Sequence, residues 1–150
     1  MAVDGEVRVP IARDDDVVPA RAEGRALAGR LGFSRTDATL IATAISEVAR
    51  NILVHAGTGT VVLRPARDDR RCGVIVEASD SGPGIRDLDR ALDGSPGSKG
   101  GLGLGLPGAR RIMDEFEIET APGRGTTVLM TKWRDRDELE RLQLRRAPAG

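Results

Sequence analysis

The sequence is poor in the residues that build several common kinds of site. It has one cysteine, Cys72, and one histidine, His55, too few for an internal disulfide or for a zinc site made of cysteine and histidine. It also has two phenylalanines, one tryptophan and no tyrosine, which leaves few aromatic faces on which nucleic-acid bases can stack. These absences argue against a disulfide scaffold, a zinc protein and a base-stacking nucleic-acid binder.

The sequence also lacks an excess of charge of either sign, and it lacks long hydrophobic runs. The 23 basic and 23 acidic residues give a formal net charge of zero, so no overall field attracts nucleic acid or an anionic membrane. No apolar run approaches the roughly 20 residues of a membrane-spanning helix, and the N-terminus lacks the basic flank and apolar core of a signal peptide. With the single cysteine, this predicts a cytoplasmic protein that binds neither nucleic acid nor membrane.

Glycine, by contrast, is abundant and concentrated in one part of the chain. Eleven of the 19 glycines lie between Gly82 and Gly125. Glycine inside regular elements is destabilising, so this density indicates a backbone that approaches something closely. Where free backbone N–H groups precede a helix, the partner that fits them is a phosphate.

Hydrophobic periodicity and turn residues predict one domain over residues 1–133, followed by a tail, 134–150, that is partly helical or disordered. Helices are expected at 14–31, 34–56 and about 101–116, and strands at 6–11, 60–65, 72–79, 117–120 and 126–133. The segment 86–100 is rich in Asp, Gly, Ser and Pro. We expect it to be a mobile loop that acts as a lid beside a ligand site.

The helix expected at 34–56 carries two polar residues, Glu47 and Asn51, one turn apart on the same face. They flank an apolar stripe formed by Ile41, Ile45, Val48 and Ile52. Two interpretations are open. The pair can be ordinary surface residues, or it can be a carboxylate and an amide oxygen arranged for a proton and a hard cation.

Asp80 falls where the second strand of a predicted hairpin ends, and Gly82 and Gly84 follow it. This pattern fits a simple tight turn. It also fits a carboxylate that accepts a hydrogen bond from an exocyclic amine, beside glycines that clear space for a flat ring. Further along, Lys99 can reach a phosphate or remain solvated, and Thr126 can direct its hydroxyl toward a site or be an ordinary strand threonine.

A second glycine-rich run, Gly101-Leu102-Gly103-Leu104-Gly105, precedes the helix that has Pro107 in its first turn. The run is neither a Walker loop nor a dinucleotide fingerprint, because it lacks the GxxxxGK[ST] pattern and does not sit in a βαβ unit. Its backbone N–H groups are nevertheless suited to phosphate.

These motifs stand together in a recognisable order: Glu47 to Asn51, then DSGPGI from Asp80, GLGLG from Gly101, and GRGT ending at Thr126. The set resembles the GHKL ATPases over about residues 34–133. Within that superfamily the sequences of these motifs are most similar to those of the RsbT-type serine/threonine switch kinases. The anti-sigma kinases of the RsbW and SpoIIAB type are the next most similar group.

The resemblance implies an α/β (α+β) fold, the Bergerat fold: a two-layer sandwich of a mixed, mainly antiparallel sheet with helices on one face. It implies ATP and Mg²⁺ as cofactors, with Asn51 on Mg²⁺, Glu47 as catalytic base and Asp80 on the adenine amino group. The implied nucleotide-binding set is Asp80, Gly82, Gly84, Ile85, Lys99, Gly101, Leu102, Gly103, Leu104, Gly105 and Thr126.

The resemblance also implies partners. RsbT-type kinases phosphorylate serine or threonine on STAS-domain antagonist and scaffold proteins, and after release they activate a metal-dependent protein phosphatase. Two alternatives remain: an anti-sigma kinase that sequesters a sigma factor, and a non-catalytic module whose binding is gated by nucleotide. The presence of both Glu47 and Asn51 favours catalysis over the last of these.

Overall fold

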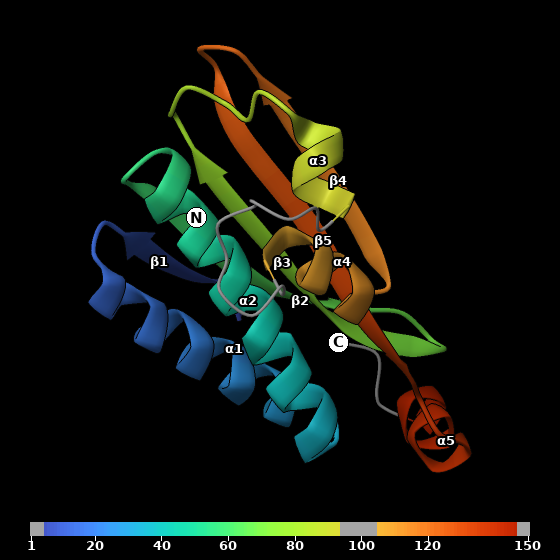
Figure 1. Ribbon diagram of the computed structural model, residues 1–150. Helices are drawn as coiled ribbons and strands as arrows, with labels where there is room; N and C mark the ends of the chain where they lie inside the picture. Colours follow the sequence, from blue (N-terminus) through green and yellow to red (C-terminus); the bar gives the residue numbers. More distant parts are fainter. Residues whose placement is uncertain (1–4, 94–104, 147–150) are drawn as a thin grey trace.

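The computed structural model describes residues 5–93 and 105–146, which form one sheet with helices on one of its faces (Figure 1). The strands are β1 (Val7–Ile11), β2 (Gly59–Arg67), β3 (Arg71–Asp80), β4 (Glu115–Ala121) and β5 (Gly125–Asp135). Their order in the sheet is β1-β2-β3-β5-β4, and every pairing is antiparallel. The predicted fold class is confirmed, and the described sheet is antiparallel throughout.

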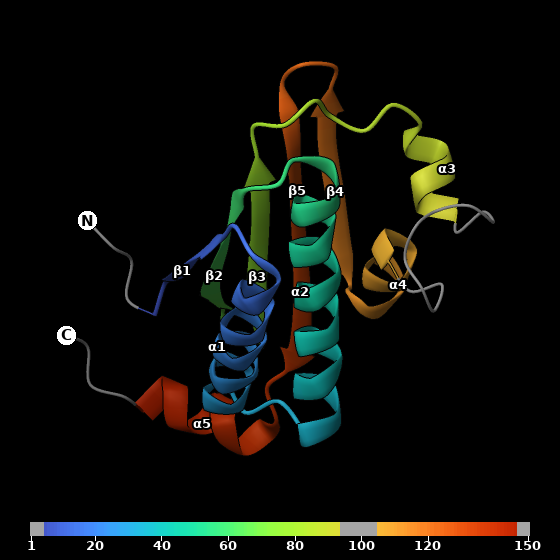
Figure 2. The ribbon, with the colours of Figure 1, turned by 60° about the vertical axis from the view of Figure 1, so that its left-hand side comes forward.

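The helices are η1 (Asp14–Asp16), α1 (Val17–Arg30), α2 (Arg35–His55), α3 (Leu88–Asp93), α4 (Gly105–Ile112) and α5 (Glu138–Arg146). The first long pair, α1 and α2, lies side by side over the sheet, with α4 packed against α2 (Figure 2). The start of α2 is fixed by Ser34, whose Oγ accepts a hydrogen bond from the Asp37 backbone N–H at 3.0 Å. Ser34 is therefore the N-cap of α2.

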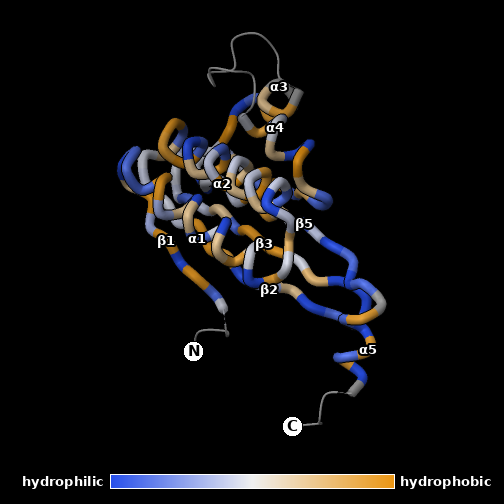
Figure 3. Tube along the Cα trace, turned by 90° about the horizontal axis from the view of Figure 1, so that it is seen from below, coloured by the Kyte–Doolittle hydropathy of each residue, from blue (hydrophilic) through white to orange (hydrophobic). Residues whose placement is uncertain are grey.

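The core lies between the helix layer and the sheet. The apolar stripe predicted on α2 is fully buried there, since none of its four side chains is more than 1% exposed. Alternate residues of the central strands face it: Val61, Leu63, Val74, Val76, Val128 and Met130. Hydrophobic stretches of β1, β2 and β3 accordingly lie along the helix layer when the molecule is seen from below (Figure 3).

Two local predictions need correction. Part of the segment expected to be a loop, 86–100, is the helix α3, and the rest of that segment from residue 94 lies outside the described residues. The helix expected to include Phe116 ends at Ile112, and Phe116 belongs to β4. The chain leaves the helix there because the Asp114 backbone N–H donates to the Thr131 carbonyl at 2.9 Å, which begins the β4–β5 pairing.

The last strand continues two residues beyond the predicted end, to Asp135, and the tail then forms α5 beyond the end of the sheet. The helix predicted in the tail is thus present, while the domain boundary at residue 133 stays a prediction. Within the described parts of the chain, no helix has the length and apolar character needed to cross a bilayer.

Candidate functional site

Asp80 is the last residue of β3, and its half-buried carboxylate is held by the backbone around it. Its Oδ1 accepts hydrogen bonds from the Gly82 N–H at 2.9 Å and from the Thr126 N–H at 3.2 Å. No residue that the structure describes donates a hydrogen bond to Oδ2. One oxygen therefore fixes the orientation of the group, and the other remains available to a ligand donor.

Glycines crowd the backbone of Asp80 from two neighbouring strands. A Cβ on Gly125 would collide with the Asp80 carbonyl oxygen, and a Cβ on Gly59 would collide with the Ser79 carbonyl oxygen. Gly125 also has φ +81°, a conformation that L side chains rarely adopt. The sequence placed Gly125 in the GRGT motif, but it gave neither glycine this packing role, because their closeness to Asp80 follows from the strand register, which pairs Gly59 with Asp80 and Asp80 with Thr126.

Gly82 and Gly84 have packing reasons of their own. A Cβ on Gly82 would lie 2.5 Å from the Ala56 Cβ, just past the end of α2, and one on Gly84 would lie 2.5 Å from the Ala121 carbonyl oxygen. The space that these glycines leave is thus filled by protein, whereas we expected it to face a flat ring. Their observed effect is to let the loop after Asp80 lie against α2 and the β4–β5 turn.

A hydroxyl that sequence reasoning missed joins this loop to the sheet. Thr120 Oγ1 accepts a hydrogen bond from the Ile85 N–H at 2.8 Å and lies 2.9 Å from Thr126 Oγ1. Thr126 therefore reaches Asp80 through its backbone N–H, while its buried hydroxyl contacts Thr120. Thr120 and Thr126 are partners across β4 and β5, a relationship that no local sequence pattern reveals.

The second part of the site is on α2, where Glu47 is 8% exposed and Asn51 is half-buried. Glu47 Oε1 forms an ion pair with Arg50 Nη1 at 3.1 Å. The Asn51 amide forms no hydrogen bond with a described residue. Sequence reasoning assigned no role to Arg50, although its position three residues after Glu47 was a usable signal.

The loop after Asp80 lies against the C-terminal end of α2, the half of the helix that carries Glu47 and Asn51, and this end of α2 lies near the end of β3 in Figure 2. Gly82 contacts Ala56, and Asn51 precedes Ala56 by five residues, or about 7.5 Å along the helix axis. The first residue of α4, Gly105, has φ +45°, and α4 packs against α2 with Leu106 buried. The other predicted phosphate-binding residues, Lys99, Gly101, Leu102, Gly103 and Leu104, lie outside the described residues.

The arrangement fits a nucleotide and one hard cation better than a metal centre built from protein alone. Within residues 5–93 and 105–146, no three His, Cys, Asp or Glu side chains gather in a way that could hold a metal. The Asn51 amide supplies a single oxygen, which suffices for Mg²⁺ when phosphates and waters complete its shell. The available Asp80 Oδ2 fits an amine donor such as that of adenine.

Comparison with known proteins adds three findings. Residues 11–132 match the histidine kinase-like ATPase domain. The chain is 42% identical over 125 residues to the serine/threonine-protein kinase RsbT of Bacillus subtilis (strain 168), covering 83% of this chain and 94% of that relative. It is 32% identical over 120 residues to the anti-sigma F factor of Caldanaerobacter subterraneus subsp. tengcongensis, covering 76% and 82% respectively.

Solved structures give a more distant likeness. A histidine kinase domain from Erythrobacter litoralis EL346 superposes with a TM-score of 0.47 at 22% sequence identity. The superposition covers 79% of this chain and 59% of that one.

Proposed function

The chain belongs to the histidine kinase-like ATPase family and is a protein serine/threonine kinase, and from that premise we propose that it is an ATP- and Mg²⁺-dependent partner-switching kinase. In this proposal it phosphorylates serine or threonine on STAS-domain antagonist and scaffold proteins in the cytoplasm. Once released from them, it binds and activates a metal-dependent protein phosphatase. The domain at residues 1–133 carries the kinase, and the tail at 134–150 is an addition to it.

The observation that carries the proposal is the state of the Asp80 carboxylate. Its Oδ1 is held by the Gly82 and Thr126 N–H groups at 2.9 and 3.2 Å, so the side chain is oriented before a ligand arrives. Its Oδ2 then accepts a hydrogen bond from the exocyclic amino group of adenine. Leaving this half-buried acceptor without a donor once a ligand covers it is costly, which makes such a contact selective for an amine-bearing base.

The residues on α2 supply the chemistry of transfer in this proposal. Glu47 accepts the proton of the attacking hydroxyl, and Asn51 holds Mg²⁺ together with the phosphates. The bound Mg²⁺ neutralises charge on the phosphates, which is most of what phosphoryl transfer requires besides positioning. Arg50 holds the Glu47 carboxylate on α2 at 3.1 Å, so the base is positioned when the substrate hydroxyl arrives.

The phosphate contacts are assigned to the glycine-rich run that leads into α4. The N–H groups of Gly101, Gly103 and Gly105 bind phosphate oxygens, with Leu102, Leu104 and Lys99 beside them. Support comes from the position of Gly105 at the first turn of α4, where unpaired N–H groups and the helix dipole favour an anion. Gly82, Gly84 and Ile85 shape the loop on which the base rests.

A second candidate is favoured by the likeness to anti-sigma F factors. In that alternative the same nucleotide site serves a kinase that sequesters a sigma factor and is displaced from it by an antagonist. The two candidates share every residue assigned above and differ in the protein that is retained. Pull-down with STAS-domain, phosphatase and sigma-factor baits separates them.

The experiment that tests the proposed function uses Glu47→Gln, which keeps the size of the side chain and removes the base. We expect transfer of label from ATP to a STAS-domain partner to fall by about 10²–10⁴-fold, while ATP affinity stays within about twofold. Asn51→Ala removes the metal ligand, so it should weaken Mg²⁺-dependent ATP binding as well as transfer.

Glu23→Gln on α1 is the matched control, because it makes the same chemical change away from the site and should preserve both binding and transfer. Full transfer by Glu47→Gln would remove the assignment of Glu47 as the base. Nucleotide binding by the parent without transfer to any STAS-domain or anti-sigma antagonist would leave the non-catalytic, nucleotide-gated module as the function.

A further inference from the structure

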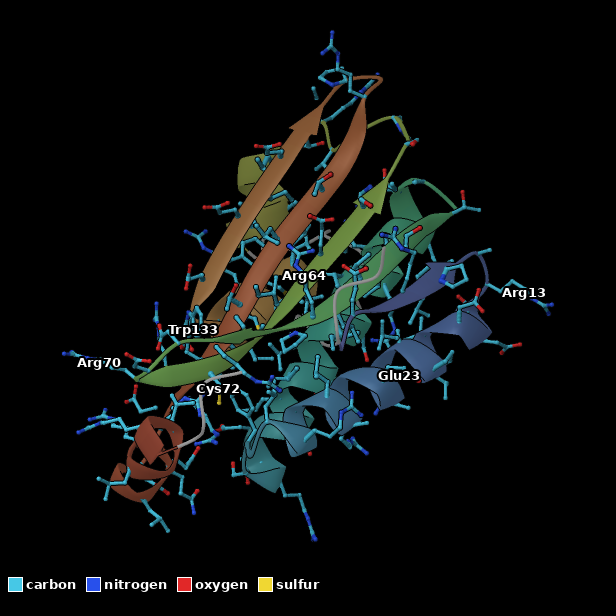
Figure 4. All side chains as sticks on the ribbon, turned by 180° about the vertical axis from the view of Figure 1, so that it is seen from behind. Arg13, Glu23, Arg64, Arg70, Cys72 and Trp133 are labelled. Atoms are coloured by element: carbon cyan, nitrogen blue, oxygen red, sulfur yellow. The ribbon has the colours of Figure 1, made fainter. Side chains whose placement is uncertain are left out.

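A pocket lies at the end of the molecule remote from Asp80, between the turn that joins β2 to β3 and the helix α5. Its volume is about 350 Å³, and it is lined by Asp69, Arg70, Arg141, Leu144 and Arg145. Arg70 projects at the tip of the β2–β3 hairpin, beside α5 (Figure 4). Asp69 and Arg70 thus belong to the hairpin turn, and the other lining residues belong to α5.

The charges that face this pocket are unbalanced. Three guanidinium groups line it against one carboxylate, that of Asp69. None of the three arginines forms an ion pair with a described residue. In addition, Arg141 Nε is buried and has no hydrogen-bond partner, the one such side-chain atom in the described parts of the chain. A buried donor without a partner is costly, so Arg141 would gain from an acceptor that its guanidinium group can reach.

The walls of the pocket are held in place by several hydrogen bonds. Asp68 Oδ1 accepts from the Arg70 and Arg71 N–H groups, both at 2.8 Å, and so fixes the hairpin turn. Arg136 joins that turn to the start of α5, since its N–H donates to the Arg70 carbonyl at 2.7 Å and its Nε to the Asp68 carbonyl at 2.9 Å. The geometry of the pocket is therefore preorganised.

A bidentate ion pair anchors α5 itself. Arg134 Nη1 and Nη2 donate to the two carboxylate oxygens of Glu140 at 2.9 and 2.7 Å. Glu140 is thereby engaged by Arg134 from β5, and its charge does not neutralise the pocket arginines.

The pocket is separate from the nucleotide site. Strand β3 runs from Arg71, beside the pocket, to Asp80, and nine residue steps of a strand span about 30 Å. A nucleotide held by Asp80 cannot extend its phosphates over that distance. A nucleotide bound at Asp80 is therefore not the ligand of this pocket.

We propose that this pocket binds the phosphate group of a phosphorylated serine or threonine carried by a partner protein. Three arginines and one aspartate leave a net charge of +2, which matches a phosphate ester of charge −1.5 to about −2 at pH 7. Guanidinium groups suit phosphate because they donate parallel hydrogen bonds. The inference rests on the proposed function, because the proposed kinase activity produces such phosphorylated residues. The pocket would retain a partner protein that is already phosphorylated on one residue.

The test measures binding of N-acetyl-phosphoserine amide to the full chain without nucleotide, by calorimetry and by the NMR signal of the Arg141 Nε–H. We expect the phosphoserine compound to bind and to shift that signal, whereas N-acetyl-serine amide does neither. Arg70→Gln and Arg145→Gln, both at exposed positions, should each weaken binding by about tenfold. Asp69→Asn should tighten it, because it removes the one negative charge in the lining.

Arg21→Gln, an exposed arginine on α1, is the charge-matched control and should bind like the parent. Equal binding by the parent, Arg70→Gln and Arg145→Gln would overturn the proposal. So would a response to anionic phospholipid vesicles or inorganic phosphate without any response to the phosphoserine compound. Glu47→Gln should bind phosphoserine normally, so loss of kinase activity and loss of this site are distinguished in one series.

Discussion

Thr126 and Asp80 are opposite one another across β5 and β3, and the Thr126 backbone N–H donates to Asp80 Oδ1 at 3.2 Å. This contact and the Gly82 N–H both engage Oδ1, so Oδ2 has no hydrogen-bond donor among the described residues. The carboxylate at the strand end is thus an oriented acceptor and not a freely rotating surface group.

Asp80→Asn tests this orientation. The amide oxygen can still accept from the Gly82 and Thr126 N–H groups, which places the amide NH₂ where Oδ2 was. A donor then faces the amino group of adenine, and we expect ATP affinity to fall by about tenfold or more. Calorimetric titration with a nonhydrolysable ATP analogue measures it. Unchanged affinity in a folded variant would show that Asp80 does not bind the base.

Thr120→Val tests the hydroxyl that joins the loop at Ile85 to the sheet. The substitution keeps the shape of the side chain but leaves the Ile85 N–H without its acceptor, so the free energy of unfolding should fall by about 1–3 kcal/mol. Thr127→Val, on the opposite face of β5, is the matched control and should change stability by less than about 0.5 kcal/mol. Equal effects in urea denaturation would contradict the role given to Thr120.

Comparing Gly125→Ala with Gly123→Ala separates the cost of a steric collision by the new Cβ from the cost of backbone strain. Both glycines have positive φ, +81° and +74°, but a Cβ on Gly125 would collide with the Asp80 carbonyl, whereas one on Gly123 would meet nothing within 4 Å. We expect Gly123→Ala to cost about 1–2 kcal/mol from strain alone. Gly125→Ala should cost clearly more and should also weaken ATP binding, because it displaces Asp80. Thermal unfolding and nucleotide titration of both variants measure the difference.

The stabilisation that the Arg134–Glu140 ion pair gives to the folded chain should depend on pH. The side-chain hydrogen bonds from Arg134 lower the pKa of Glu140 from 4.5 to about 2. A lowered carboxylate pKa stabilises the folded state fully above the unfolded pKa, and that stabilisation declines as the pH falls from about 4.5 toward 2. The parent should therefore be more stable than Glu140→Gln at pH 7, and the gap should narrow at pH 3.

Denaturant unfolding of the parent and Glu140→Gln at pH 7, 4 and 3 measures this gap. Glu23→Gln serves as the control, because Glu23 forms no ion pair with a described residue, and it should show no such narrowing. A gap between the parent and Glu140→Gln that is constant with pH would show that the Arg134 contact does not stabilise the folded chain.

Much of the fold follows from local patterns in the sequence. The cap at Ser34, the stripe on α2 and the alternation along β5 depend on residues that are near one another in the chain, so periodicity is sufficient to place them. The prediction that the helix reaches Phe116 was wrong for the opposite reason. Ile112, Met113 and Phe116 continue a helical stripe, but pairing between β4 and β5 places Phe116 in a strand. Tertiary contacts thus override the local helical pattern.

The sequence by itself determined which residues could carry the chemistry: Glu47 and Asn51 one helical turn apart, and Asp80 at a strand end among glycines. Only the tertiary structure decided how they are held. The contact between Thr120 and Thr126 and the packing of Gly59 and Gly125 against the end of β3 depend on strand register. Register and packing join residues as far apart as Asp80 and Thr126, which are 46 positions apart in the chain, and no local pattern encodes such contacts.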